Sequence, residues 1–306
     1  MEPVIFQGGI YKHEQMVELV EDLGGYILQK NLLQLDVIIV MLVPNADLPL
    51  VEAKAKELLG KLTKAPLAGA EVAVVTPTLA YQHLPHLACD IAEYLRRAGA
   101  KTNMIGLARG VGKRIAQLKA HEIDLINEHD IAIFTYGNFR DCIVEKTRLF
   151  RDIQVPIIVT GGPMMTKDEV PGCVDYVGGL GRIMHRTRQK EEIALLDRLV
   201  EATGRVLDEK RLELDKDPLS VSPPRVATEI GKQIPDIPEA LAPTPVTLQL
   251  NGLRLKVPYA EYKDKILNVR FDEGIYMRQV AKLYPSRMKD YIILRILPKS
   301  ETGFVI

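Results

Sequence analysis

Short apolar runs alternate with stretches of helical spacing through the middle of the chain. Between residues 70 and 182 the runs AEVAVVTP, KTNMIGLA, IAIFTYGN, VPIIVTGGP and VDYVGG are separated by turn residues and amphipathic segments. This alternation is typical of a mainly parallel sheet covered by helices. It predicts a Rossmann-like α/β domain over residues 65–217. We expect a helix from His185 to about Asp217 to close it, with Ile193, Leu196, Val200 and Leu207 at helical spacing.

Two smaller modules flank this domain. Residues 1–64 are interpreted as a strand, helix, strand, helix α+β unit, with Met16, Leu19, Val20 and Leu23 on one helical face and VIIVMLV as a buried strand. The pattern leaves open whether this unit is separate or extends the main sheet. Residues 246–306 are interpreted as a second α+β module with a helix-like stretch, EGIYMRQVAKLY, and a strand-like one, DYIILRILP. It opens with the hairpin VTLQL-NG-LRLKV, in which Asn251 and Gly252 favour a type I′ turn.

Proline marks the boundary before the second module. Residues 218–245 hold seven of the chain's 19 prolines and few apolar residues, which predicts an extended linker. Beyond it, residues 244–306 carry 11 Lys and Arg against 6 Asp and Glu, although the whole chain has a formal net charge of zero. The zero net charge therefore hides an acidic body and a basic tail, which suits a subunit held among several partners.

Composition narrows the class of protein. The 306 residues are 47% apolar and 26% charged, the balance of a soluble globular protein. Zero net charge and the absence of Trp argue against nucleic-acid binding and against an anionic membrane surface. Three cysteines are too few for a disulfide framework, and the longest apolar stretch, Val37–Val43, is too short to span a bilayer. We expect a cytoplasmic protein with reduced thiols.

The three cysteines follow predicted strands. Cys89, Cys142 and Cys173 come after the strands that end at Thr76, near Tyr136 and near Thr160. Because ligands bind beyond the carboxyl ends of strands in open α/β sheets, the pattern predicts that the three thiols converge at one edge. Thiolates suit iron, iron–sulfur clusters or zinc, and His83, His86 and His185 are placed where one of them could complete a ligand set, to which His86 is assigned. The alternative is that the cysteines are small buried hydrophobic residues.

Glycine-rich turns provide a second candidate site. Arg109, Gly110, Gly112 and Lys113 follow a strand and open a helix, where backbone N–H groups and two cations favour an anion. Ile115 breaks the dinucleotide fingerprint, and no P-loop is present, so ATP hydrolysis is expected in a partner. Gly161 and Gly162 form a tight strand exit on the same edge, and this position assigns them to the cofactor-binding residues as well. No nucleophile elbow, HExxH motif or catalytic carboxylate pair is visible, so no catalytic residue is assigned.

Several longer segments resemble one protein family. HLPHLACDIAEYLRR at residues 83–97, TNMIGLARGVG at 102–112 and the opening segment GGIYKHEQMVELVEDLGGYILQK are similar to methanogenesis marker protein 7. The resemblance covers most of the first 180 residues and is weaker in the linker and tail.

The resemblance implies a function in methanogenic archaea. It implies a cytosolic, non-catalytic subunit of the ATP-dependent complex that reductively activates methyl-coenzyme M reductase, with electrons delivered to its nickel cofactor. The implied partners are other methanogenesis marker proteins, a small operon-encoded subunit, an ATPase component and the reductase itself. The implied cofactor is an iron–sulfur cluster of the large nitrogenase-precursor type, and widely spaced cysteines at strand exits fit such a site. Two alternatives stay open, a nucleotide- or S-adenosylmethionine-binding enzyme and a cofactor-free scaffold.

Overall fold

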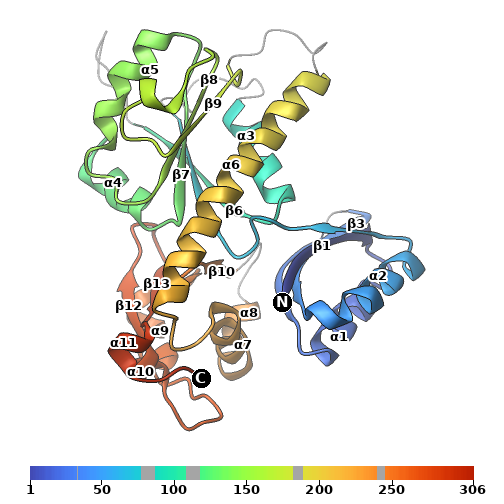
Figure 1. The fold of residues 1–306 in the computed structure, drawn as a ribbon. Coiled ribbons are helices and arrows are strands. Elements are labelled where there is room, and N and C mark those ends of the chain that lie inside the picture. The colour runs from blue at the N-terminus through green and yellow to red at the C-terminus, as the bar shows by residue number, and fades with distance from the viewer. Residues whose placement is uncertain (33, 77–86, 108–117, 182–188, 240–244) are drawn as a thin grey trace. The chain divides into compact units, whose positions relative to one another are not determined.

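The computed structural model of the protein describes residues 1–32, 34–76, 87–107, 118–181, 189–239 and 245–306 (Figure 1). These residues form two compact units. The first unit combines both ends of the chain, Met1–Gly69 with Leu214–Pro285 and Lys289–Ile306. The second consists of Ala70–Glu213 with Ser286–Met288. Within the described ranges, no helix has both the length and the apolar character needed to cross a membrane.

The N-terminal module of the first unit has its own antiparallel sheet. Its elements are β1 (Glu2–Gly9), α1 (Glu14–Asp22), β2 (Tyr26–Leu32), β3 (Asp36–Val43), the short 3-10 helix η1 (Asn45–Asp47), α2 (Leu48–Glu57) and β4 (Lys61–Lys64). The strand order β2-β3-β1-β4 gives a split β-α-β arrangement. Met16 and Val20 of α1 are buried against β1 and β3, as their spacing predicts. The module therefore does not extend the parallel sheet.

The C-terminal module of the first unit carries a second antiparallel sheet. Its strand order is β10-β11-β13-β12. Its elements are α7 (Pro223–Gln233), α8 (Asp236–Glu239), β10 (Val246–Gln249), β11 (Gly252–Leu255), α9 (Tyr259–Leu267), α10 (Met277–Val280), β12 (Ala281–Pro285), β13 (Ile292–Ile296) and α11 (Lys299–Thr302). The small α+β module expected at this end of the chain is therefore present.

The proline-rich segment is not an extended linker, and that prediction is wrong for residues 223–239. Pro223 and Pro224 occupy the first turn of α7, where a missing N–H costs nothing because no intrahelical partner exists. Four apolar side chains that follow at helical spacing are buried in the core of the C-terminal module: Val226, Ile230, Ile234 and Ile237. The prolines begin a packed helix instead of preventing one.

Two further details of the C-terminal module differ from the prediction. The hairpin forms, but Gln249 pairs with Gly252, so Leu250 and Asn251 make the turn and neither Asn251 nor Gly252 has a positive φ. Gly252 is needed because β13 lies close, and a Cβ there would be 1.9 Å from the Leu294 carbonyl oxygen. In EGIYMRQVAKLY only Met277–Val280 is helical, since the following residues pair with β13.

The second unit is the predicted α/β domain. Its strands are β5 (Glu71–Thr76), β6 (Lys101–Gly106), β7 (Ile131–Thr135), β8 (Ile157–Gly161) and β9 (Asp175–Gly178), all parallel and in the order β6-β5-β7-β8-β9. This is a doubly wound order, and its direction reverses between β5 and β7, where such folds place their ligands. Between the strands lie α3 (Leu87–Arg97), α4 (Ala120–Asn127), α5 (Arg140–Lys146), the 3-10 helices η2 (Thr147–Phe150) and η3 (Lys167–Glu169), and finally α6 (Gln189–Lys216).

Helices cover both faces of this sheet. Ile126 of α4 and Ile143 of α5 pack with Phe134 and Val159 on one face. On the other face Thr102 of β6 donates to the Ala92 carbonyl of α3, and Arg205 of α6 pairs with Asp175 of β9. The predicted helix α6 is present. However, Ile193 is 43% exposed, and the buried residues of α6 with apolar side chains are Leu199, Ala202, Val206 and Leu207.

Candidate functional site

The carboxyl edge of the parallel sheet is the candidate site. Five residues that the sequence assigns to it lie outside the described ranges, namely His86, Arg109, Gly110, Gly112 and Lys113. Their roles stay predictions. The described part of the edge consists of the start of α3, the connection from β7 to α5, and the residues that follow β8 and β9.

Two of the three cysteines lie at this edge. Cys89 is exposed in the first turn of α3, the helix after β5, and Cys142 is half-buried in the first turn of α5, the helix after β7. Because β5 and β7 are neighbours at the reversal of strand order, both helices begin at the predicted ligand edge. The two helices cover opposite faces of the sheet, so Cys89 and Cys142 lie on opposite sides of it.

Cys142 lies in a polar pair on α5. The Lys146 ammonium donates a hydrogen bond to the Cys142 sulfur, with 2.8 Å between Nζ and Sγ. The same Nζ is 5.1 Å from the ring centroid of Tyr136, a cation–π distance. The pair places a positive charge beside the sulfur.

Tyr136 lies beside this pair with its polar group buried. Its side chain is only 4% exposed, and its hydroxyl has no hydrogen-bond partner among the described residues. Burial and, to a smaller extent, the neighbouring Cys142 raise the pKa of Tyr136, so the hydroxyl keeps its proton. Tyr136 therefore offers an unused donor close to Cys142 and Lys146. No pattern in the sequence marks Tyr136 as a site residue, because a tyrosine at a strand end resembles an ordinary core residue.

The glycines after β8 are explained by close packing. A Cβ on Gly161 would lie 2.6 Å from Ile143 Cδ1, and a Cβ on Gly162 would lie 2.2 Å from the Asn138 amide oxygen. A Cβ on Gly181 would lie 1.9 Å from the same oxygen. The Gly162 N–H is already donated to the Gly137 carbonyl. These contacts account for the glycines, and cofactor binding by Gly161 and Gly162 stays a prediction.

Cys173 lies at the opposite edge of the sheet, and the predicted convergence of three thiols is wrong. The chain leaves β8 at Gly161, passes through η3, and has returned to the amino end of the sheet before Cys173, because β9 starts at Asp175 and runs parallel to β8. Desolvation, then the Asp175 carboxylate, raise the pKa of the Cys173 thiol to about 11, so it is protonated at neutral pH. Cys173 therefore behaves as part of the packing around η3.

The sequence missed two exposed apolar side chains near the carboxyl edge. Phe139, at the start of α5, is 78% exposed, and Met164, which follows Pro163 beyond β8, is 70% exposed. Such residues in turns give no periodic signal. Among the described residues, no group of three or more His, Cys, Asp or Glu side chains is arranged to hold a metal ion. The edge therefore supplies two thiols, one ammonium and one free hydroxyl, but not a complete ligand set.

Comparison with known proteins places the chain in a family. Residues 1–269 match the family model described as methyl-coenzyme M reductase operon protein C. The chain is also 47% identical over 303 residues to an uncharacterized protein of Methanocaldococcus jannaschii, in an alignment that covers 99% of this chain and 96% of the relative. The family match extends through both compact units. The chain therefore belongs to the methyl-coenzyme M reductase operon protein C family.

Proposed function

We propose that the protein is a methanogenesis marker protein 7 subunit of the ATP-dependent complex that reductively activates methyl-coenzyme M reductase in methanogens. In this role it is not a catalyst; it helps to bind an iron–sulfur cluster and to deliver electrons to the nickel cofactor. The observation that carries the proposal is the match to the methyl-coenzyme M reductase operon family over residues 1–269. The resemblance of residues 83–97 and 102–112 to marker protein 7 supports the finer assignment.

The thiols at the carboxyl edge define what this chain contributes to a cluster. Cys89 is exposed, and Cys142 has the Lys146 ammonium at its sulfur. A positive charge beside a cluster ligand offsets the negative charge of thiolates and sulfides. However, the described residues do not fit a cluster by themselves, because Cys173 lies at the other edge. We infer that further ligands come from residues outside the described ranges or from a partner of the kind implied above: another marker protein, the small operon-encoded subunit or the ATPase component.

Iron content tests the proposed site. We expect Cys89→Ala and Cys142→Ala to lower the iron bound per chain in the anaerobically isolated complex. Cys173→Ala is the matched control, since it removes a thiol of the same type from the opposite edge, and it should leave iron unchanged. Equal iron in all three variants, or a loss confined to Cys173→Ala, would contradict the assignment of Cys89 and Cys142.

Reductive activation tests the function itself. In a reconstituted mixture of inactive reductase, ATP, reductant and the partner proteins, omission of this chain should abolish the appearance of the Ni(I) electron paramagnetic resonance signal. Adding back the wild-type chain should restore the signal, and adding back the double variant Cys89→Ala and Cys142→Ala should not. Full activation without the chain would refute the proposed role, whatever the iron content of the cysteine variants.

A further inference from the structure

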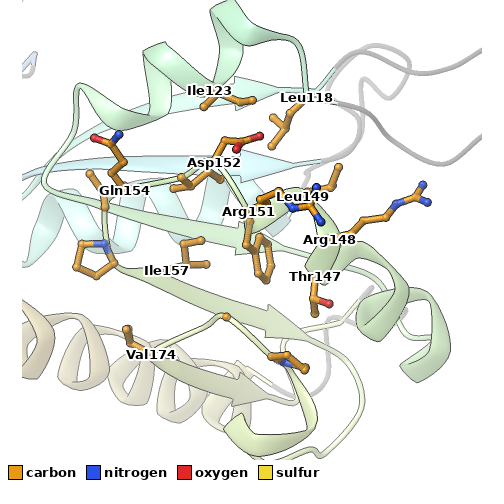
Figure 2. Close-up of a pocket in the computed structure, with 16 residues that line it drawn as sticks. Leu118, Ile123, Thr147, Arg148, Leu149, Arg151, Asp152, Gln154, Ile157 and Val174 are labelled. Carbon is orange, nitrogen blue, oxygen red and sulfur yellow. The ribbon is translucent and has the colours of Figure 1, made fainter.

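The α/β unit also has a groove, which lies away from the carboxyl edge of its sheet. This open groove of about 1230 Å³ is lined by every residue from Thr147 to Ile157, together with Leu118 and Ile123 on one side and Val174 on the other (Figure 2). Ile157 and Val174 stand at the amino ends of β8 and β9. The groove contains none of the residues that the sequence assigned to a site, so the function proposed above does not use it.

The floor of the groove is apolar and firmly supported. Leu149, Ile153 and Val155 are partly exposed in the groove and pack against the core below them. Phe150 supports this floor, since its ring meets that of Phe134 edge-on at 4.9 Å between centroids. Val174 adds an apolar wall that is 44% exposed. A partly exposed apolar surface on a rigid support is suited to accept apolar side chains from another molecule.

The groove also carries two cations without carboxylate partners. Arg148 and Arg151 are exposed, and neither is within salt-bridge distance of any carboxylate in the described part of the chain. By contrast, Arg140 and Arg205 of the same unit are paired with Glu169 and Asp175.

The one acidic lining residue does not neutralise these arginines. In Figure 2 the Asp152 carboxylate is directed toward Ile123, and the Arg148 guanidinium extends away from it at the end of the groove near Thr147. This end of the groove is therefore positively charged beside an apolar floor. A guanidinium presents a planar fork of N–H donors that matches a carboxylate.

The shape of the groove favours a peptide over a small molecule as its ligand. A small-molecule site encloses most of its ligand, whereas the described part of this groove is open to solvent. Peptide segments bind such grooves by laying apolar side chains on the floor while their charges meet the rim. We propose that the groove of Thr147–Ile157 binds an acidic segment of a protein partner, with apolar side chains on Leu149, Ile153 and Val155 and carboxylates on Arg148 and Arg151.

Fluorescence anisotropy with the full chain tests this proposal. The probe is a labelled synthetic peptide with Leu and Glu at amphipathic helical spacing, and its counterpart replaces every Glu by Lys. We expect the Leu–Glu peptide to bind and the Leu–Lys peptide to bind at least about tenfold more weakly, because like charges would meet at the rim. Failure of the Leu–Glu peptide to bind, or equal binding of the two peptides, would overturn the proposal.

Charge-reversal variants test whether the peptide binds in the groove. The double variant Arg148→Glu and Arg151→Glu should weaken binding of the Leu–Glu peptide by about tenfold or more. Arg198→Glu, a charge reversal at an exposed position of α6, is the matched control and should leave binding unchanged. Val174→Glu should weaken binding and Val174→Arg should not. An unaffected double variant, or displacement of the peptide by ATP at equal concentration, would show that the groove is not the proposed peptide site.

Discussion

The three cysteines of this chain have three different environments. Cys89 is exposed on α3, Cys142 accepts a hydrogen bond from Lys146, and Cys173 is desolvated near η3. Reactivity of a thiol follows its thiolate fraction and its exposure. The reactivity of each thiol therefore does not follow from its being a cysteine. It depends on where the residue lies in the α/β pattern and on which edge of the sheet its connection has reached.

Alkylation rates should separate Cys173 from Cys89. Burial raises the pKa of Cys173 to about 11, so at about pH 7 almost no thiolate is present, and the rate should increase about tenfold for each pH unit as the pH rises toward the pKa. Iodoacetamide labelling followed by peptide mass spectrometry measures both sites in one sample. Exposed Cys89 serves as the internal reference and should be labelled first. Equal labelling of the two cysteines near neutral pH would contradict the described environment of Cys173.

At this scale the sequence predicted the position of two cysteines in the fold and misplaced the third. Cys89 and Cys142 lie in the first turns of the helices that follow β5 and β7, at the edge where the strand pattern put them, and ligand binding by them stays a prediction. The strand pattern failed for Cys173, because the connection from β8 returns to the amino edge before that residue, and no local pattern marks such a return. Tyr136 was missed because its significance depends on the missing hydrogen-bond partner, which only a three-dimensional structure reveals.

At the scale of elements, strands were easier to predict than the helix α7. The buried strands β5, β7 and β8 are continuous apolar runs, and nothing in their sequences competes with that pattern. In the segment of α7 and α8 the prolines suggested an extended chain, although the apolar residues from Val226 to Ile237 recur at helical spacing. Proline prevents a helix in its interior but is favoured at the first position, so its place within the segment matters more than its frequency.

A core substitution in α7 tests whether this segment is structural. Ile230 is fully buried in the core of the C-terminal module, so Ile230→Ala should lower the free energy of unfolding by about 2–4 kcal/mol through lost burial and the cavity it leaves. Thr228→Ala, at an exposed position of the same helix, is the matched control and should cost less than about 1 kcal/mol. Urea unfolding of the full chain measures both. A loss for Ile230→Ala no larger than that for Thr228→Ala would favour an unpacked linker.

At the scale of the whole molecule, the chain is less modular than its composition suggests. Charge and proline content divided it into an acidic body, a linker and a basic tail. The structure instead joins the N-terminal module and the C-terminal module in one compact unit, and assigns Ser286–Met288 to the other. Within that second unit Ser286 and the Arg287 N–H donate to the Glu128 carboxylate, at 2.7 and 2.6 Å. Contacts between residues more than 150 positions apart leave no periodic pattern, which is why the sequence did not predict them.

Leu28 tests the coupling of the two modules within the first unit. It lies at a β-bulge in β2, between Ile27 and Gln29, and packs against the core of the C-terminal module as well as against Ile5 and Val40. Leu28→Ala should therefore lower the stability of both sheets, by about 1–2 kcal/mol for a half-buried leucine.

Hydrogen exchange followed by mass spectrometry shows where the Leu28→Ala variant loses stability. Amide exchange should accelerate in β10, β11 and β13 as well as in β2 and β3. The reason is that Leu28 contributes apolar contacts to the cores under both sheets, and the alanine removes them. Leu32→Ala, at a position of the same strand that is 55% exposed in the wild type, is the matched control and should leave the C-terminal strands unchanged. If exchange in Leu28→Ala rises only in β2 and β3, the two modules fold independently and the leucine does not couple them.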